Sequence, residues 1–530
     1  MSPPDARAGR PGVAQLLQQA ARYQQAGQYA QAELAARTAY AIQPRNPEVL
    51  FALGWLTGQM GNKPAGIELL KKCVQLDPQR AVAWQELGIM HQHIAQPEEA
   101  INAYERAMFL NPRLVDSYAA CSMVHEKMRQ PEKSRAVLEK GLKKNPGDAQ
   151  LTVFLAELDA REGRADEARA ALERVVVTSK DPAALVRAWH ALGTARDKQG
   201  EHVAAFAAFA ESNRMMLATP TAQHCLAITD STYLAEIRAY HAISAEQLAA
   251  WGKVRLSDGL PDPGMLIGFP RSGTTMTEQA LGVHSKVRTL DERSVLWKTE
   301  REARRVLEPD TPPSVVPSPE KWAALLDGAS DEALTQIRRF YWEEAKRDSG
   351  IDVEELTRAG QILIDKNPQN IARISLVARI FPHARTLVMI RDPRDCCISA
   401  FTQRFGLNPG MVNFLSLDRT AMVYELMMGE WLRIRELLAL PMLVARYEDT
   451  VEDFPVYARR MVEFFGLQWE PDVLGFHEKA AKKFVSTPSF RDVARPVYTT
   501  AKARWKRYPG CIDSILPRLA PFVKAFHYEL

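Results

Sequence analysis

The sequence predicts an all-α solenoid followed by an α/β domain with a central parallel sheet. Prolines recur at a step of 34 residues, at Pro44, Pro78, Pro112 and Pro146. A fixed period of that length is typical of stacked helical repeats. Later in the chain, an apolar run within 265–284 leads into a Gly- and Ser-rich turn and then a helical pattern, and a second apolar run at 386–390 ends at a charged residue. Short apolar runs alternating with helical segments favour a parallel sheet.

The composition excludes several functional classes. Of the 530 residues, 46% are hydrophobic and 25% are charged, as in ordinary globular proteins, and no apolar run approaches the roughly 20 residues of a membrane span. The net charge of +4 is too balanced to favour a nucleic-acid partner. The six cysteines form no C-x-x-C pair, so no zinc site is expected, and without an Asp/His cluster at ligand spacing no other metal site is expected either. The thinly spread cysteines, and an N-terminus without the apolar core of a secretory signal, favour a cytoplasmic location.

The clearest repeat unit covers residues 81–114. Its small and large residues fall at the spacings of the tetratricopeptide repeat, at Trp84, Leu87, Gly88, Ala100, Tyr104, Ala107 and Pro112. Gly88 and Ala100 are small where two antiparallel helices are expected to cross, and Leu87 and Tyr104 fill the space between them. Pro112 ends the second helix because proline cannot continue the backbone hydrogen bonds.

We count six such units over residues 13–219, and a helical connector at 220–262 leads to the α/β domain at 263–530. The concave face of the array is expected to be rich in glutamine, with Gln24, Gln25, Phe51, Gln59, Gln85, Gln92 and His93. Such faces bind extended peptides or neighbouring domains, although a solvated face without a ligand is an equal alternative.

The segment MLIGFPRSGTTMTEQALGVH (265–284) predicts an anion site between a strand and a helix. The spacing of Gly268 and Gly273, followed by two threonines, nearly matches the nucleotide-binding P-loop G-x-x-x-x-G-K-[ST]. Thr274 replaces the lysine, and Arg271 supplies a positive charge earlier in the loop. In a nucleoside triphosphatase, the lysine of this motif holds the outer phosphates of the nucleotide. Because this loop has no such lysine, we expect it to bind an anion other than a nucleoside triphosphate.

The segment FPHARTLVMIRDPRDCCISAF (381–401) predicts a second phosphate site. Arg391 ends a buried strand, and Ser399 lies on the first turns of the next helix. A guanidinium and a hydroxyl can bind one phosphate together. A structural arginine paired with Asp392 or Asp395 remains the alternative.

Together the two segments resemble the sulfotransferase superfamily, whose donor is 3′-phosphoadenosine 5′-phosphosulfate (PAPS). PRSGTT (270–275) is similar to that family's 5′-phosphosulfate loop, and RDPRDCCIS (391–399) is similar to its 3′-phosphate motif. The resemblance is strongest to tyrosylprotein sulfotransferases and to bacterial proteins that join tetratricopeptide repeats to such a domain. It covers about residues 263–530.

The resemblance implies a role for each matching residue and no metal. The implied catalytic residues are Glu292 as general base, Lys366 on the bridging and sulfuryl oxygens, and an assisting Ser489. The implied donor-binding residues are Arg271, Ser272, Gly273, Thr274, Thr275, Arg391, Ser399, Tyr447 and Arg504. Local alternatives remain open for three of these residues: Glu292 as a partner of Arg293, Lys366 as a solvated strand-end lysine, and Ser489 beside other hydroxyls, Ser486 and Thr487.

We therefore expect a cytoplasmic enzyme that transfers a sulfuryl group from PAPS to a hydroxyl. By family resemblance the acceptor is a protein or peptide hydroxyl such as tyrosine, held in part by the repeat array. The alternatives are a repeat scaffold whose transferase domain binds the nucleotide but is inactive, and a P-loop kinase, which the missing lysine disfavours.

Overall fold

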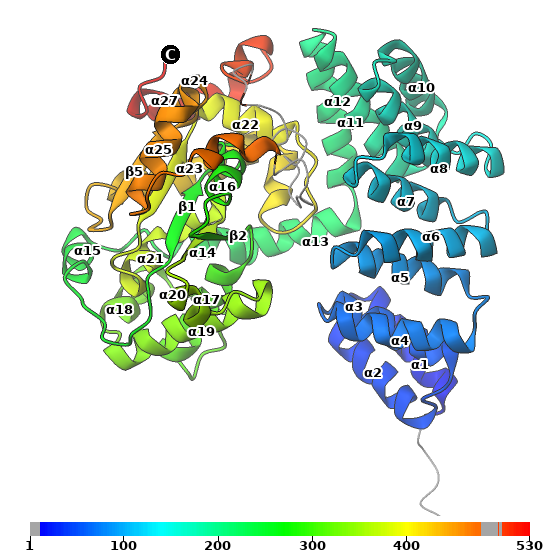
Figure 1. The fold of residues 1–530 in the computed structure, drawn as a ribbon, viewed down its shortest axis with the longest axis horizontal. Helices are drawn as coiled ribbons and strands as arrows, with labels where there is room; N and C mark the ends of the chain where they lie inside the picture. Colours follow the sequence, from blue (N-terminus) through cyan, green and yellow to red (C-terminus); the bar gives the residue numbers. More distant parts are fainter. Residues whose placement is uncertain (1–10, 479–496, 498–500, 530) are drawn as a thin grey trace, which may run out of the picture. The chain divides into compact units, whose positions relative to one another are not determined.

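The computed structural model describes residues 11–478, 497 and 501–529, and it confirms the predicted fold class. The chain divides into two compact units, with the boundary between Ala195 and Arg196. The first unit is a solenoid of paired helices, and the second contains a five-stranded parallel sheet with helices on both faces (Figure 1).

The solenoid helices keep the 34-residue step. They are α1 (Val13–Gln25), α2 (Tyr29–Ile42), α3 (Pro47–Gln59), α4 (Lys63–Leu76), α5 (Ala81–His93), α6 (Pro97–Leu110), α7 (Val115–Lys127), α8 (Pro131–Lys144), α9 (Ala149–Arg161), α10 (Ala165–Thr178) and α11 (Pro182–Lys198). From α3 to α10, each first helix and each second helix begins 34 residues after its predecessor. Each of the four periodic prolines lies two residues beyond the end of a second helix, as Pro112 follows Leu110.

The packing inside the 81–114 unit follows from its small residues. Leu87 is 2% exposed, and Ala100 and Tyr104 are fully buried. A Cβ atom added to Gly88 would lie 2.6 Å from Cε1 of Tyr104, so the ring occupies the space that a side chain would need. The glycine therefore allows the two helices to cross at the aromatic ring, as the repeat spacing predicts.

The residues expected on the concave face differ in exposure. Gln24, Gln25, Gln59 and His93 are exposed, whereas Phe51, Gln85 and Gln92 are partly buried. Oε1 of Gln85 accepts a hydrogen bond from Ser117 at 3.0 Å, and Oε1 of Gln92 accepts one from the hydroxyl of Tyr104 at 3.0 Å. These two glutamines thus satisfy polar groups inside the array.

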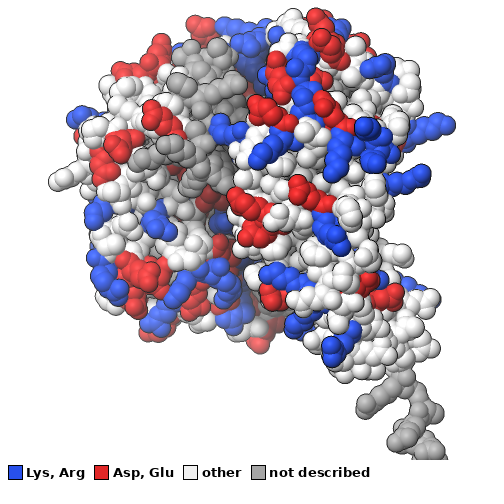
Figure 2. Space-filling model, turned by 45° about the vertical axis from the view of Figure 1, so that its right-hand side comes forward, with Lys and Arg blue, Asp and Glu red and all other residues white. Residues whose placement is uncertain are grey.

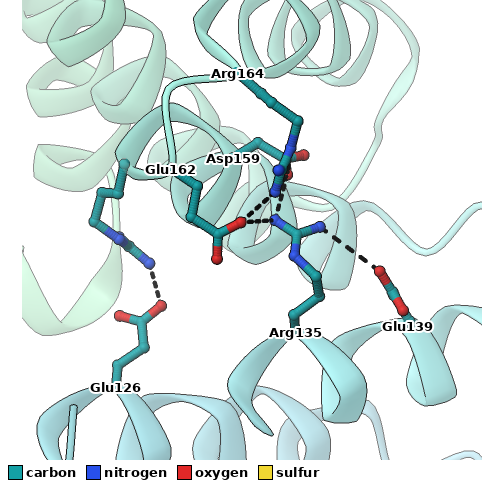
Figure 3. Close-up of polar contacts among 7 residues, drawn as sticks. Glu126, Arg135, Glu139, Asp159, Glu162 and Arg164 are labelled. Atoms are coloured by element: carbon teal, nitrogen blue, oxygen red, sulfur yellow. Dashed lines mark hydrogen bonds and ion pairs between the residues drawn. The ribbon is translucent and has the colours of Figure 1, made fainter. Parts of the chain in front are cut away.

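Ion pairs join successive units of the array (Figure 3). Arg135 on α8 lies 2.5 Å from Asp159 and 2.8 Å from Glu162 of the next unit, and Arg164 also pairs with both carboxylates. Arg161 likewise pairs with Glu126 on α7. All of these carboxylates are partly shielded from water, so the contacts help to keep neighbouring units in register.

The second unit begins in the last turn of α11 and contains all of the later helices that the structure describes. Its α-helices are α12 (His202–Leu217), α13 (Pro220–Ile228), α14 (Leu234–Arg238), α15 (Ala245–Trp251), α16 (Thr274–Leu281), α17 (Val295–Leu307), α18 (Pro319–Asp327), α19 (Asp331–Ser349), α20 (Val353–Arg358), α21 (Ile374–Ile380), α22 (Pro393–Phe401), α23 (Leu417–Ile434), α24 (Tyr447–Glu452), α25 (Phe454–Phe464) and α27 (Leu516–Ala525). One π-helix, η1 (Thr229–Tyr233), and short 3₁₀ helices, η2 (Pro368–Arg373), η3 (Met411–Leu415), η4 (Pro471–Gly475), η5 (Arg504–Arg507) and η6 (Asp513–Ile515), complete the described helical elements.

The sheet has the strand order β2-β3-β1-β4-β5, and all neighbouring pairs are parallel. The strands are β1 (Gly264–Gly268), β2 (Val287–Asp291), β3 (Ile362–Lys366), β4 (Thr386–Ile390) and β5 (Met442–Arg446). From β1 the chain continues to β2 on one side of the sheet, and from β4 it continues to β5 on the other side. A crevice is therefore expected at the carboxyl ends of β1 and β4, where open parallel sheets bind ligands.

Two hydrophobic cores hold the sheet between layers of helices. One face packs against α16 and α25, through residues such as Leu281 and Met461. The other face packs against a larger core that includes Leu296 of α17, Tyr341 of α19 and Trp431 of α23. The central strands β1, β3 and β4 are therefore buried on both faces, which explains their apolar sequences, whereas the edge strands β2 and β5 each expose a residue.

The described helices and surface agree with the composition. Within residues 11–478, 497 and 501–529, none of the helices combines the length and apolar character that crossing a membrane requires. Figure 2 shows acidic and basic side chains interspersed over the displayed face, in keeping with the small net charge.

Candidate functional site

The candidate site lies where the parallel strands end. Lys366 is the last residue of β3, Glu292 directly follows β2, and Arg391 directly follows β4. In the β2–β3 register, Asp291 is paired with Lys366. Because parallel strands end at one edge of a sheet, residues far apart in the sequence meet here.

Lys366 forms the centre of a charged cluster. Its side chain is fully buried, and its Nζ atom lies 2.6 Å from Oδ1 of Asp291 and 3.0 Å from Oε1 of Glu292. Burial alone would lower the pKa of Lys366, but the carboxylates of Glu292 and Asp291 outweigh it and raise the pKa. Lys366 is thus a buried ammonium, which excludes the solvated strand-end alternative.

Glu292 is held in an unusual backbone conformation. Its φ angle is +51°, in the left-handed region that non-glycine residues rarely adopt. Its amide donates a 2.8 Å hydrogen bond to the carbonyl of Lys366, and its side chain pairs with the ammonium of the same lysine. The backbone bond and the side-chain pair together fix the carboxylate of Glu292 at the strand ends, while about a third of the side chain stays exposed.

The loop after β1, where the sequence predicts an anion site, leads directly into the first turn of α16. Gly273 has a φ angle of +100° and precedes α16, so Thr274 and Thr275 form the first turn of that helix, whose amides lack helical partners. A Cβ atom at Gly273 would lie 2.6 Å from Cδ2 of Tyr447, so the position requires glycine for space as well as for φ. The hydroxyl of Ser272 is buried and has no hydrogen-bond partner among the described residues.

Arg391 lies beside this loop and is 6% exposed. Its Nη1 donates to the carbonyl of Arg271 at 3.1 Å, and its Nη2 donates to the carbonyl of Ala501 at 2.6 Å. Asp395 lies 3.5 Å away, and the guanidinium stands 4.7 Å from the ring centre of Tyr447. Its Nε atom is buried and has no hydrogen-bond partner among the described residues. The arginine therefore combines a structural role with one open donor.

The two predicted phosphate sites adjoin each other. Nε of Arg271 donates a 3.0 Å hydrogen bond to the hydroxyl of Ser399 on α22. The structure thus brings Arg271, Ser272, Gly273, Thr274, Thr275, Arg391, Ser399 and Tyr447 together at the ends of β1, β4 and β5.

Arg504 is not in contact with this group in the described contacts. The guanidinium of Arg504 lies 2.9 Å from Asp197, at the end of α11, and 2.9 Å from the hydroxyl of Tyr508. Ser489 lies outside the described residues. Nothing in the described part of the chain forms a group of three or more His, Cys, Asp or Glu residues that could hold a metal ion.

Comparison with known proteins matches parts of both units to families. Residues 263–471 match the family model described as Sulfotransferase family, and residues 47–80 and 127–192 match Tetratricopeptide repeat models. Residues 263–471 are a sulfotransferase-family domain. The resemblance predicted from the two phosphate motifs is thereby confirmed at the level of the domain and the repeats.

Relatives of the sulfotransferase domain are distant. An uncharacterized protein of Aquifex aeolicus is 27% identical over 259 residues, which cover 48% of this chain and 32% of that protein. Protein-tyrosine sulfotransferase 2 of Gallus gallus is 24% identical over 280 residues, covering 49% of this chain and 68% of that protein. Among solved structures, pilF of Pseudomonas aeruginosa is 18% identical and covers 39% of this chain and 93% of that chain, with a TM-score of 0.34. This chain thus spans about a third of the Aquifex protein.

Three carboxyl groups of the sulfotransferase domain were missed by sequence reasoning. Asp291 pairs with Lys366, and Glu278 on α16 is buried and accepts a 2.6 Å hydrogen bond from Thr289. Burial raises the pKa of Glu278, and the charge of Lys366 opposes that effect. Asp365 is fully buried beneath the site. The only signal in the sequence is that Asp291 and Asp365 directly precede Glu292 and Lys366 at strand ends.

Replacing Asp365 with Asn is expected to remove part of the pH dependence of stability. Burial raises the pKa of Asp365 to about 7, above the roughly 3.9 of an unfolded chain. The folded state therefore binds this proton more tightly, and its stability falls as pH rises from about 4 to about 7. Asp365→Asn stays neutral and should gain stability relative to wild type above pH 7.

Urea unfolding of both proteins at pH 5 and pH 8 measures this difference. The variant should have the higher midpoint at pH 8 and the smaller change between the two pH values. An unchanged difference between the two proteins at both pH values would contradict the assignment.

Proposed function

We propose that this protein transfers a sulfuryl group from PAPS to the hydroxyl of a protein or peptide, with tyrosine as the leading acceptor. The sulfotransferase-family domain and the distant likeness to protein-tyrosine sulfotransferases support the reaction class. The observation that carries the proposal is the pair of buried, unpartnered donors, Oγ of Ser272 and Nε of Arg391, at adjoining anion sites. Buried polar groups normally have partners, so this pair favours a bound anion with two separate phosphate groups.

The donor-binding residues would divide between these two groups. Arg271, Ser272 and the amides at Gly273, Thr274 and Thr275 would bind the 5′-phosphosulfate at the start of α16. Arg391 and Ser399 would bind the 3′-phosphate through a guanidinium and a hydroxyl. Tyr447, whose ring adjoins both Gly273 and Arg391, would pack against the nucleotide.

Transfer would proceed by in-line displacement at sulfur. The acceptor hydroxyl gives its proton to the carboxylate of Glu292 as its oxygen forms the new bond to sulfur. The bond between sulfur and the phosphate oxygen breaks, and adenosine 3′,5′-bisphosphate leaves with the electron pair. Lys366, assisted by Ser489, would stabilise the charge that builds on the leaving oxygen. The pairing of Lys366 with Glu292 at 3.0 Å supports this division of roles, because both groups belong to one small site.

Two measurements test the reaction. Calorimetry should detect binding of adenosine 3′,5′-bisphosphate and much weaker binding of ATP, since the loop lacks the P-loop lysine. Cell extract incubated with isotope-labelled PAPS should yield labelled sulfated products in mass spectrometry. Bisphosphate binding without any product would favour the inactive scaffold, and preferential ATP binding would favour a kinase.

Truncation of Arg391 is expected to impair donor binding before it affects chemistry. Arg391→Ala removes a buried charged partner, worth about 2–4 kcal/mol, or roughly 30- to 1,000-fold in the dissociation constant. Ser399→Ala removes a neutral hydroxyl and should weaken binding only a few-fold. Calorimetric titration with adenosine 3′,5′-bisphosphate checks both values. Equal affinity of Arg391→Ala and wild type would remove Arg391 from the donor site.

We also propose that the repeat array holds part of a protein acceptor and so raises its concentration near Glu292. Tetratricopeptide repeats support this role because their concave faces commonly bind peptides. The exposed residues Gln59 and His93 are the best probes, because Gln85 and Gln92 also satisfy neighbouring side chains.

Replacing Gln24, Gln25, Gln59 and His93 together with Ala should raise KM for a protein acceptor and leave turnover of a small phenol unchanged. That pattern is expected when binding remote from the reacting atoms is lost. Steady-state kinetics with both acceptors provides the measurement. If both acceptors behave as they do with wild type, the array does not select the substrate, and a scaffold role gains support.

A further inference from the structure

Residues 501–508 contact Arg391, which is proposed to bind the donor's 3′-phosphate. The carbonyl of Ala501 accepts a 2.6 Å hydrogen bond from Nη2 of Arg391. Four residues later, the amide of Trp505 donates a 2.7 Å bond to Asp395, which lies 3.5 Å from Arg391. The orientation of the Arg391 guanidinium therefore depends on where this segment sits.

Asp197, in the last turn of α11, holds the far end of this segment, in addition to the bonds that Lys502 makes to Glu452 and Trp505 makes to Asp395. The hydroxyl of Tyr508 donates to Oδ1 of Asp197 at 2.5 Å, and Nη2 of Arg504 donates to Oδ2 at 2.9 Å. His202 contacts Oδ1 at 3.0 Å. Burial alone would raise the pKa of Asp197, but Arg504, Tyr508 and His202 outweigh it and lower the pKa. Asp197 therefore stays ionised and contacts Arg504, Tyr508 and His202 at the same time.

Helix α12 extends this support to Ser399. Tyr508 is fully buried, and its ring centre lies 5.6 Å from that of His202 and 6.2 Å from that of Phe206. Phe206 also stacks on Phe401 with ring centres 5.1 Å apart. Nδ2 of Asn213 donates a 2.9 Å hydrogen bond to the carbonyl of Phe401, two residues after Ser399 on α22. Helix α12 thus packs against two elements of the proposed 3′-phosphate site. One is the segment 501–508, which contacts Arg391, and the other is α22, which carries Ser399.

We propose that Asp197 is a positioning residue for the 3′-phosphate site. By holding Arg504 and Tyr508, it keeps the carbonyl of Ala501 on Arg391 and leaves Nε of that arginine free to meet the phosphate. Arg504 then acts through Asp197 rather than as a direct ligand of the donor. The inference rests on the proposed function, because it assumes that Arg391 and Ser399 bind the 3′-phosphate.

A double-mutant cycle tests the proposal on the full-length protein. Asp197→Asn and Arg504→Gln should each weaken binding of adenosine 3′,5′-bisphosphate roughly tenfold, since each breaks the same charged contact. The double variant should bind no more weakly than either single variant, because interacting residues are not additive. Lys506→Gln is the matched control, since it removes a positive charge from the same short helix at an exposed position, and it should bind like wild type.

A second ligand separates positioning from general loss of structure. Adenosine 5′-monophosphate lacks the 3′-phosphate, so its weaker binding should be the same in wild type and Asp197→Asn. Equal weakening of both ligands would mean that Asp197 only stabilises the fold. Unchanged or tighter bisphosphate binding in Asp197→Asn, combined with a loss in Arg504→Gln, would make Arg504 a direct ligand and overturn the proposal. Failure of wild type itself to bind the bisphosphate would instead refute the proposed function.

Discussion

Replacing Glu292 with Gln is expected to lower turnover by about 10²- to 10⁴-fold while leaving donor affinity nearly unchanged. The amide keeps the shape of the carboxylate, and its oxygen can still accept the hydrogen bond from Lys366. It cannot accept the acceptor's proton. The loss should therefore appear in kcat.

Steady-state kinetics and bisphosphate titration together measure this split. Glu320→Gln is the matched control, because Glu320 is an exposed glutamate on α18, and its replacement should leave both quantities at wild-type values. Near-normal turnover of Glu292→Gln would mean that another group takes the proton or that the acceptor arrives ionised.

Lys366→Met is expected to have the second large effect, on both turnover and stability. Loss of the group proposed to stabilise the leaving oxygen should lower kcat by about 10²- to 10³-fold. Removing one partner of a buried ion pair costs about 3–5 kcal/mol, and here it takes the ammonium of Lys366 away from both Asp291 and Glu292. Partial exposure of both carboxylates should place the stability loss at or below the lower end of that range.

A second lysine provides the control for this variant. Lys298 on α17 also contacts two carboxylates, Glu344 at 2.9 Å and Asp348 at 2.8 Å, but its side chain is 34% exposed and lies outside the candidate site. Lys298→Met should cost some stability and leave kcat unchanged. Kinetics corrected for the folded fraction distinguishes the two roles, and equal kcat losses in both variants would show that Lys366 has no special part in the chemistry.

Local sequence signals predict the secondary structure and the strand-end residues of this chain well. The 34-residue step of prolines predicts where second helices end, because proline removes a backbone donor wherever it stands. The apolar runs before Gly268 and Arg391 predict buried parallel strands, and residues after such strands necessarily meet at one edge. These signals are local, so one sequence suffices to recognise them.

Contacts between distant segments could not be predicted in the same way. The pairing of Lys366 with Asp291 depends on the β2–β3 register, which joins residues 75 positions apart. Asp197 and Arg504 are 307 positions apart, and neither stands in a pattern that names the other. Gln92 is predicted on the concave face, but its oxygen also satisfies the buried hydroxyl of Tyr104. In each case tertiary packing decides which partner a polar side chain meets.

The strict phase of the helix starts from α3 to α10 has a consequence for how the array can change in length. Because each unit contacts mainly its neighbours, duplicating or deleting 34 residues recreates the interfaces that already exist. A shorter insertion would rotate every later helix out of phase. The array can therefore be lengthened or shortened in whole units by tandem duplication or deletion, while the residues at the strand ends of the second unit remain as they are.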